Sequence, residues 1–244
     1  FSDMHRSRLV VIKGKDLKSN FPGIYNVGKA AVEEPRLIDL KWGRESAPKV
    51  TLVGKGVCFD SGGLNIKSSS GMVKMKKDMG GAAMVLGLAH MIIDAKLDIR
   101  LRLLIPTVEN SIGKHSYHPG DVLTTRSGKT VEIGNTDAEG RIILADSLSF
   151  AAEEKIDLLI DIATLTGAAR VALGPDLPAL FTQKNNTYRE IENQTLSNED
   201  MLWRLPLWEH YKKYISSNIA DLNNSGSSSY AGAITAALFL KEFV

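Results

Sequence analysis

The segment TVEIGNTDAEGRIILADSLSFAAEE, residues 130–154, joins a predicted strand to a predicted helix through a turn that carries two carboxylates. Thr130–Ile133 has the pattern of a strand, and the run from Ile142 to Glu154 is typical of a helix. Between them lie Asp137 and Glu139, bracketed by glycines. Side chains two positions apart point the same way only in extended backbone. We therefore expect an extended strand end that aims both carboxylates into one cavity.

A simpler interpretation makes this turn an ordinary polar loop. Asp137 would then cap the helix, and Glu139 would interact favourably with the helix dipole. The rest of the chain favours a binding site, because two other glycine-flanked segments also carry acidic side chains. Unpaired buried carboxylates are costly, so such side chains need a cation or hydrogen-bonding partners.

Strand and helix patterns alternate along the chain. Strand patterns include Arg36–Trp42 and Asp157–Ile162, and the small-residue run Gly80–Ile93 predicts a helix that is buried on most sides. Ala163–Leu173 and Met201–Tyr214 also have helical patterns. These spacings predict an α/β domain with a mainly parallel or mixed sheet, flanked by helices on both faces.

The composition is ordinary for a globular protein and argues against several functional classes. Hydrophobic residues make up 43% of the chain and charged residues 24%. The net charge of +2 argues against nucleic acid as a main partner. No apolar run approaches the roughly 20 residues needed to span a bilayer, so no membrane is implied. The single cysteine, Cys58, fits a reducing cytoplasm, and its position at a strand end predicts a small buried residue.

Three segments are expected to bring charged side chains to one edge of the sheet, because ligand sites in parallel sheets lie at the carboxyl ends of strands. They supply four carboxylates and an amine: Lys55, Asp60, Asp78, Asp137 and Glu139. Four carboxylates around one cavity repel one another strongly unless cations lie between them. None of the five histidines lies in these segments. We therefore expect two divalent ions in an oxygen-rich site, with a lysine as an unusual nitrogen ligand.

Three motifs closely resemble the leucyl (cytosol) aminopeptidase family of dinuclear metallopeptidases. They are GKGVCFDSGGLNIK (54–67), MKKDMGGAA (75–83) and the highly specific NTDAEGR (135–141). The resemblance extends from about Gly28 to the last residue. It implies that residues 1–244 form the catalytic domain, with a phosphorylase/hydrolase-like fold. It also implies that the family's smaller N-terminal domain and the end of its C-terminal part lie outside this sequence.

The resemblance implies a role for each predicted metal ligand. Lys55 and Asp78 would bind one metal ion, and Asp137 would bind the other, more exchangeable one. Asp60 and Glu139 would bridge the two ions. A lysine binds a metal only as the neutral amine, so Lys55 would need a pKa well below about 10.4.

The same resemblance implies two catalytic residues, Lys67 and Arg141. Lys67 would polarise the scissile carbonyl, and Arg141 would hold a (bi)carbonate ion that shuttles protons. A guanidinium binds a planar oxyanion through two hydrogen bonds, which fits this role. The positions implied to contact substrate are Met75, Asn135, Thr164, Leu165 and Gly167. Core packing or a helix start would also explain these residues, and Asn135 equally fits an Asx-turn.

The family resemblance implies an aminopeptidase that releases N-terminal, leucine-like residues from peptides, through a hydroxide shared by two metal ions. The ions would be Zn²⁺ or Mn²⁺, with Mg²⁺ or Co²⁺ as alternatives. The protein would be a cytoplasmic homohexamer, a dimer of trimers. Three alternatives stay open: a DNA-binding regulatory member of the family, an inactive paralogue, and an enzyme restricted to a narrower task such as cysteinylglycine cleavage.

Overall fold

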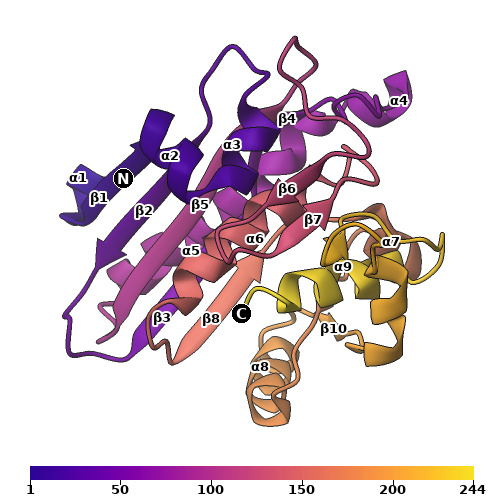
Figure 1. Cartoon of the computed structure of the whole chain (residues 1–244). Coiled ribbons are helices and arrows are strands. Elements are labelled where there is room, and N and C mark those ends of the chain that lie inside the picture. Colours follow the sequence, from indigo (N-terminus) through magenta and orange to yellow (C-terminus); the bar gives the residue numbers. More distant parts are fainter.

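The computed structural model describes residues 1–244 and centres on a six-stranded sheet (Figure 1). Five strands follow one another in the order β1 (Arg8–Lys13), β2 (Arg36–Trp42), β5 (Arg100–Asn110), β3 (Lys49–Gly54) and β8 (Leu158–Ile162). The sixth, β4 (Gly56–Asp60), pairs with the far end of β5. The β1–β2 and β2–β5 pairs are antiparallel, whereas β3, β4 and β8 run parallel to their neighbours. The expectation of a mixed α/β sheet is confirmed.

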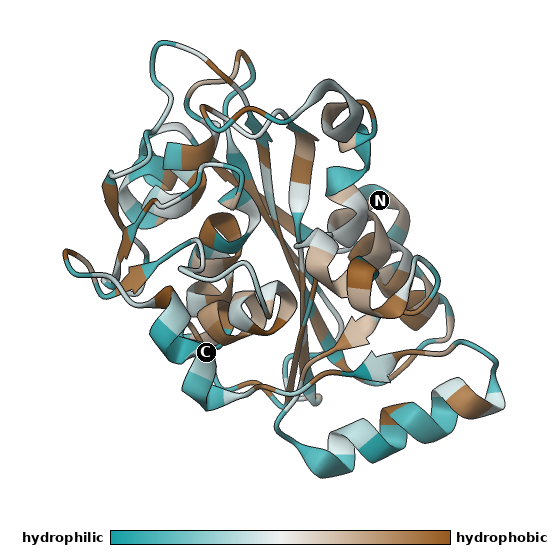
Figure 2. Ribbon diagram, turned by 90° about the vertical axis from the view of Figure 1, so that its right-hand side faces the viewer, coloured by the Kyte–Doolittle hydropathy of each residue, from teal (hydrophilic) through white to brown (hydrophobic).

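Helices cover both faces of this sheet, as Figure 2 shows with the sheet seen nearly edge-on. One face packs against α2 (Gly14–Asn20), α3 (Pro22–Gly28) and α6 (Glu139–Ala152), and α9 (Gly232–Lys241) packs on α6; together they form a core of 24 buried apolar residues. The other face packs against α5 (Gly80–Asp94), in a smaller core of 8 buried residues. Both helical layers were expected from the alternation of strand and helix patterns.

Shorter elements connect and extend these layers. Two small sheets lie beside the main one: β6 (Val122–Thr124), β7 (Thr130–Glu132) and β11 (Leu222–Asn223) form the first, and β9 (Ala179–Leu180) and β10 (Trp203–Arg204) the second. The remaining helices are α1 (Ser2–His5), α4 (Ser69–Met72), α7 (Gly167–Leu173), α8 (Asn185–Ser197) and the 3₁₀ turns η1 (Met75–Met79) and η2 (Glu209–Ile215). No helix combines the length and the apolar character that crossing a membrane requires.

Two expectations about burial were wrong. Helix α5 is not buried on most sides, because Met84 and Met91 on its outer side are each 61% exposed. The reason is that α5 packs on the sheet with one side, and the opposite side, which carries these methionines, is left open to solvent. Cys58 is exposed and not buried, because β4 has β5 as its only neighbour in the sheet.

Two expected helices were also wrong in extent or type. The helix expected over Ala163–Leu173 begins only at Gly167, because Thr166 has extended backbone and its hydroxyl accepts a hydrogen bond from the Ala168 N–H. Met201–Tyr214 is not an α-helix. It forms the short strand β10 and most of the turn η2, in keeping with Pro206, which cannot supply a helical N–H.

Candidate metal centre

The candidate site lies where several strands end and two helices begin. Lys55 stands between β3 and β4, which follow one another along β5. Its N–H donates to the Ile162 carbonyl at 3.0 Å, and its carbonyl accepts from the Ala82 N–H at 2.9 Å. The Lys55 backbone is therefore fixed by the end of β8 and the first turn of α5. Helices α5 and α6 both start here, so the positive ends of their dipoles favour anionic groups at the site.

The Lys55 side chain is almost fully buried and joins two carboxylates. Its Nζ lies 2.7 Å from Asp78 Oδ2 and 2.9 Å from Glu139 Oε1, and it donates to the Thr164 carbonyl at 3.1 Å. Burial opposes the positive charge, but Glu139 and Asp78 outweigh burial and raise the pKa of Lys55 above its usual value. The contacts with these two carboxylates therefore favour the charged form of Lys55. Gly140 makes room for it, because a Cβ there would lie 2.6 Å from Lys55 Cε.

A second lysine joins the other two carboxylates of the site. Lys67 Nζ lies 2.8 Å from Asp60 Oδ2 and also contacts Asp137 Oδ1. Burial lowers the pKa of Lys67, but its bonds to Asp137 and Asp60 prevail and the net shift is upward. Each lysine therefore offsets one of the two negative charges of the carboxylate pair that it contacts.

Three of these carboxylates form a compact ligand set. One oxygen from each of Asp60, Asp137 and Glu139 lies within 4.8 Å of the others. Burial raises the pKa of Glu139 to about 7 against the opposing effect of Lys55, and its Oε2 has no hydrogen-bond partner. A buried carboxylate oxygen without a partner is costly, and a divalent cation would remove that cost. The donor set therefore fits a metal site.

The turn that carries two of the ligands differs from the extended strand end that was expected. Glu139 is the first residue of α6, and Ala138 before it has φ −106° and ψ 39°. The two carboxylates converge because the chain turns into the helix between them. Asp137 does not cap the helix, since Ala138 holds that position without a side-chain bond. Asn135 does form the Asx-turn, and its Oδ1 accepts a hydrogen bond from the Asp137 N–H at 2.8 Å.

Arg141 is a buried cation without a carboxylate partner. It lies in the first turn of α6, is 9% exposed and leaves its Nε and NH1 without hydrogen-bond acceptors. Its guanidinium is 5.9 Å from the centre of the Phe239 ring. Burial lowers the pKa of Arg141 to about 10, so the side chain stays charged at neutral pH. Unused buried donors on a charged group are suited to binding an anion.

Residues 2–244 match the cytosol aminopeptidase family, catalytic domain. This chain belongs to that family. The chain is 46% identical over 221 residues to a probable cytosol aminopeptidase of Nostoc punctiforme, covering 89% of this chain and 45% of the relative. A probable cytosol aminopeptidase of Gloeobacter violaceus is 46% identical over 97% of this chain and 44% of its own length. The chain thus spans about half the length of the curated relatives it matches.

Solved structures of cytosol aminopeptidase relatives have the same fold. The cytosol aminopeptidase from Coxiella burnetii superposes with a TM-score of 0.98 at 58% identity, covering all of this chain and 53% of that one. The bottromycin maturation enzyme BotP, solved in complex with Mn, superposes with a TM-score of 0.94 at 36% identity, covering 54% of its own chain. At these identities the likeness supports the fold and the family together.

In this cytosol aminopeptidase domain, two of the expected substrate-contacting residues are tied directly to the ligand cluster. The Thr164 hydroxyl donates to Asp78 Oδ1 at 2.8 Å. Leu165 packs against the larger core, and Gly167 is exposed at the start of α7, where an added Cβ would meet nothing within 4 Å. Met75 is half-buried at the start of η1, three residues before Asp78. The structure places Thr164 and Asn135 at the cluster, and Met75, Leu165 and Gly167 on segments leading to or from it.

Sequence reasoning missed two buried side chains that support the cluster. Asn110, at the end of β5, donates from Nδ2 to Asp60 Oδ1 at 2.8 Å and to the Thr136 carbonyl at 3.1 Å. The Tyr117 hydroxyl donates to that same carbonyl at 2.7 Å. Asn110 could have been found, because it is a polar residue at the carboxyl end of a strand that reaches this edge. Tyr117 lies in a segment rich in polar residues and glycine, and nothing in the pattern predicts its burial.

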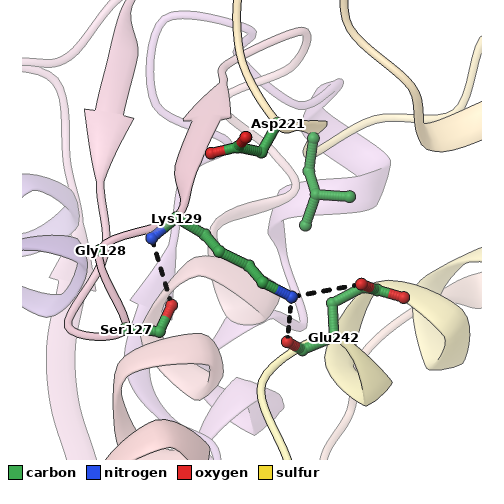
Figure 3. A pocket seen from close by; sticks show the side chains of 6 residues that line it. Ser127, Gly128, Lys129, Asp221 and Glu242 are labelled. Carbon is green, nitrogen blue, oxygen red and sulfur yellow. Dashed lines mark hydrogen bonds and ion pairs between the residues drawn. The ribbon is translucent and has the colours of Figure 1, made fainter.

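A hollow of about 370 Å³ lies away from these ligands, between the β6–β7 turn and the end of α9 (Figure 3). Lys129 crosses it and donates to the Glu242 carbonyl at 2.6 Å, with Glu242 Oε2 at 3.2 Å. Asp221 accepts hydrogen bonds from the Thr130 N–H and hydroxyl, each at 2.8 Å. The charged groups that line the hollow therefore already have partners within the chain, and none of the metal-ligand candidates lines the hollow.

Proposed function

We propose that the protein containing this domain is a two-metal aminopeptidase that hydrolyses the first peptide bond and releases N-terminal, leucine-like residues from peptides. The observation that carries the proposal is the buried cluster of four carboxylates and two lysines, with Glu139 Oε2 left unpartnered. Such a cluster contributes little to stability by itself, because desolvating charges costs as much as pairing them returns. Membership of the cytosol aminopeptidase family supports the same activity.

The chain's residues divide between two ion positions. Lys55, after losing its proton to become the neutral amine, and Asp78 would serve one position, and Asp137 would serve the other. Asp60 and Glu139 would contribute to both. Two divalent ions bound there would supply an acidified water and neutralise charge on the scissile carbonyl. Mn²⁺ or Zn²⁺ is favoured, with Mg²⁺ or Co²⁺ as alternatives, and the manganese complex of BotP supports manganese.

Lys67 and Arg141 act on the substrate side of the reaction. Once Asp60 and Asp137 are engaged elsewhere, the Lys67 ammonium is free to donate to the oxygen that becomes negative at the scissile carbon, where a preorganised charge is most effective. Arg141 offers its two unused donors to a (bi)carbonate ion. A proton carrier is needed there, because every carboxylate of the cluster is assigned to a metal.

The remaining roles and the setting of the protein follow from the same proposal. Met75, Thr164, Leu165 and Gly167 would line the substrate cleft, and Asn135 would orient the Asp137 turn and contact substrate. The names of the relatives support a cytoplasmic protein acting on peptides. We propose a homohexamer built as a dimer of trimers. The near-neutral charge disfavours a DNA-binding role, and the intact cluster disfavours an inactive paralogue.

The proposal is tested by hydrolysis of a leucyl chromogenic amide by the full-length protein. The protein is stripped of metal and titrated with Mn²⁺ or Zn²⁺, beside Glu139→Ala and, as a control, the α8 surface variant Glu190→Ala. Activity should return at about two metal ions per chain, be absent in Glu139→Ala and be normal in Glu190→Ala. A folded wild-type protein that stays inactive with every metal would overturn the proposal.

A further inference from the structure

The turn from Gly134 to Ala138 carries Asp137 and leads into Glu139, yet little regular secondary structure holds it. Its backbone is held mainly by side chains from distant segments. Asn65 accepts from the Thr136 N–H at 2.8 Å, and Asn110 and Tyr117 donate to the Thr136 carbonyl.

Asn224 makes more of these bonds than any of the other three side chains. Its Oδ1 accepts from the Gly134 N–H at 2.8 Å and from the Asn135 N–H at 3.2 Å. Its Nδ2 donates to the Asn135 carbonyl at 2.8 Å and to the Ala138 carbonyl at 3.3 Å. One amide thus satisfies two donors and two acceptors of the turn.

The position of Asn224 is itself well fixed. It is fully buried and directly follows β11, which pairs in parallel with β7. Its own N–H donates to the Glu132 carbonyl at 3.0 Å, so the β7–β11 pairing holds its backbone beside the turn. Asparagine suits this position because its amide both donates and accepts hydrogen bonds. An ionised carboxylate could only accept them, and an alkyl side chain could neither donate nor accept.

We infer that Asn224 is a positioning residue that holds the Asp137–Glu139 turn in the geometry that binds metal. The inference rests on the proposed two-metal function. Metal ligands must lie within about 0.2 Å of ideal distances, and a turn with no ladder of its own keeps that precision only if its backbone groups are held. Without the amide, four backbone groups of the turn lose a hydrogen-bond partner, and the turn is expected to relax away from the bound geometry.

The test measures metal binding, and not only activity, in the metal-stripped full-length protein. Mn²⁺ titration is followed by calorimetry and by the paramagnetic resonance signal of free Mn²⁺, for wild type, Asn224→Ala and Asn224→Ser. The matched control is Asp221→Ala, because Asp221 ties the same two strands together at the end of β7 remote from the turn.

In both Asn224 variants, one of the two Mn²⁺ sites should weaken by about 10–100-fold. Excess Mn²⁺ should restore most of their turnover, which would not follow from a general loss of folding. The Asp221→Ala control should bind Mn²⁺ like wild type, even if its melting temperature falls as far as that of the Asn224 variants. Should Asn224→Ala fail to fold, Asn224→Ser carries the comparison, since it retains a short hydrogen-bonding group.

Two outcomes overturn the inference. One is a folded Asn224 variant with wild-type Mn²⁺ affinity. The other is a loss of affinity no larger than that of an equally destabilised Asp221→Ala. Failure of the proposed function is distinguishable from both, because in that case wild type itself would bind no pair of ions and cleave no leucyl amide.

Discussion

Replacing Gly140 by alanine should separate metal binding from folding. A Cβ at Gly140 would lie 2.6 Å from Lys55 Cε, 2.8 Å from its Nζ and 3.0 Å from its Cδ. Carbon atoms pack best at about 3.5–4.0 Å, so the end of Lys55 must retreat by about 1 Å. That movement breaks the 2.7 Å and 2.9 Å contacts of Nζ with Asp78 and Glu139. It also exceeds by several-fold the tolerance of about 0.2 Å for a metal ligand.

The fold should survive this change. Gly140 is the second residue of α6 and has no positive φ, and alanine favours a helix over glycine by about 0.5–1 kcal/mol. The added Cβ would clash with the flexible end of the Lys55 side chain, which can move. We expect the metal-free protein to remain folded, with a free energy of unfolding that falls by no more than about 3–5 kcal/mol as the buried Lys55 contacts lengthen, while metal affinity at the Lys55 position falls by at least about 10–100-fold.

The assay combines calorimetric metal titration, leucyl amide turnover and urea unfolding of the full-length protein. Gly87→Ala is the matched control. It lies within α5, and an added Cβ there meets nothing within 4 Å, so it should gain helix stability and keep both metal ions. Wild-type metal affinity and turnover in Gly140→Ala would refute the placement of Lys55 at the metal centre.

Three further predictions follow from other residues. Asp39→Ala removes one of the two carboxylates that bind Arg102, at 2.8 and 2.9 Å. Arg102 keeps Glu154 at 2.8 Å, so the change should cost about 1.5–3 kcal/mol in urea unfolding. The exposed Asp98→Ala should cost at most about 1 kcal/mol. Arg141→Met should leave the melting temperature unchanged or raise it, since the guanidinium has no carboxylate partner. Its turnover should fall by about 100-fold and should no longer respond to added bicarbonate. Burial raises the pKa of Asp146 to about 7, so between about pH 4 and 7 the folded protein binds a proton that the unfolded chain does not. The unfolding free energy of the metal-loaded protein should therefore decrease as pH rises through this window, and Asp146→Asn should flatten that slope.

The sequence alone predicts the layers of the fold, because strands and helices in this domain keep their hydrophobic periods. Arg36–Trp42 is a strand with the expected bounds, and Gly80–Ile93 is a helix that continues to Asp94. Strand β4 (Gly56–Asp60), by contrast, is not predicted by the hydrophobic pattern. Gly56–Asp60 is a strand only because the end of β5 is available to pair with it.

The candidate site is predictable as a set of residues but not as a geometry. Strand ends and motif resemblance select the candidate ligands, and the structure brings these residues together. They do not show that Glu139 lies in a helix, since the turn before it depends on Asn65, Asn110 and Asn224. Asn224 is separated from the Asn135 backbone by 89 residues, and no local pattern reports a partner so distant. The supports of the site come from tertiary contacts.

The lysines that join the four carboxylates have a consequence for how far the fold depends on metal. Many small metal-binding domains stay unfolded until their ion arrives, because their ligands repel one another or have nothing to bind. In this domain Lys55 holds Asp78 and Glu139 together, and Lys67 does the same for Asp60 and Asp137. The two lysines thereby reduce the repulsion that the four carboxylates would otherwise exert on one another. We therefore expect a chelator to remove bound ions without unfolding the domain, and circular dichroism before and after chelation would check this.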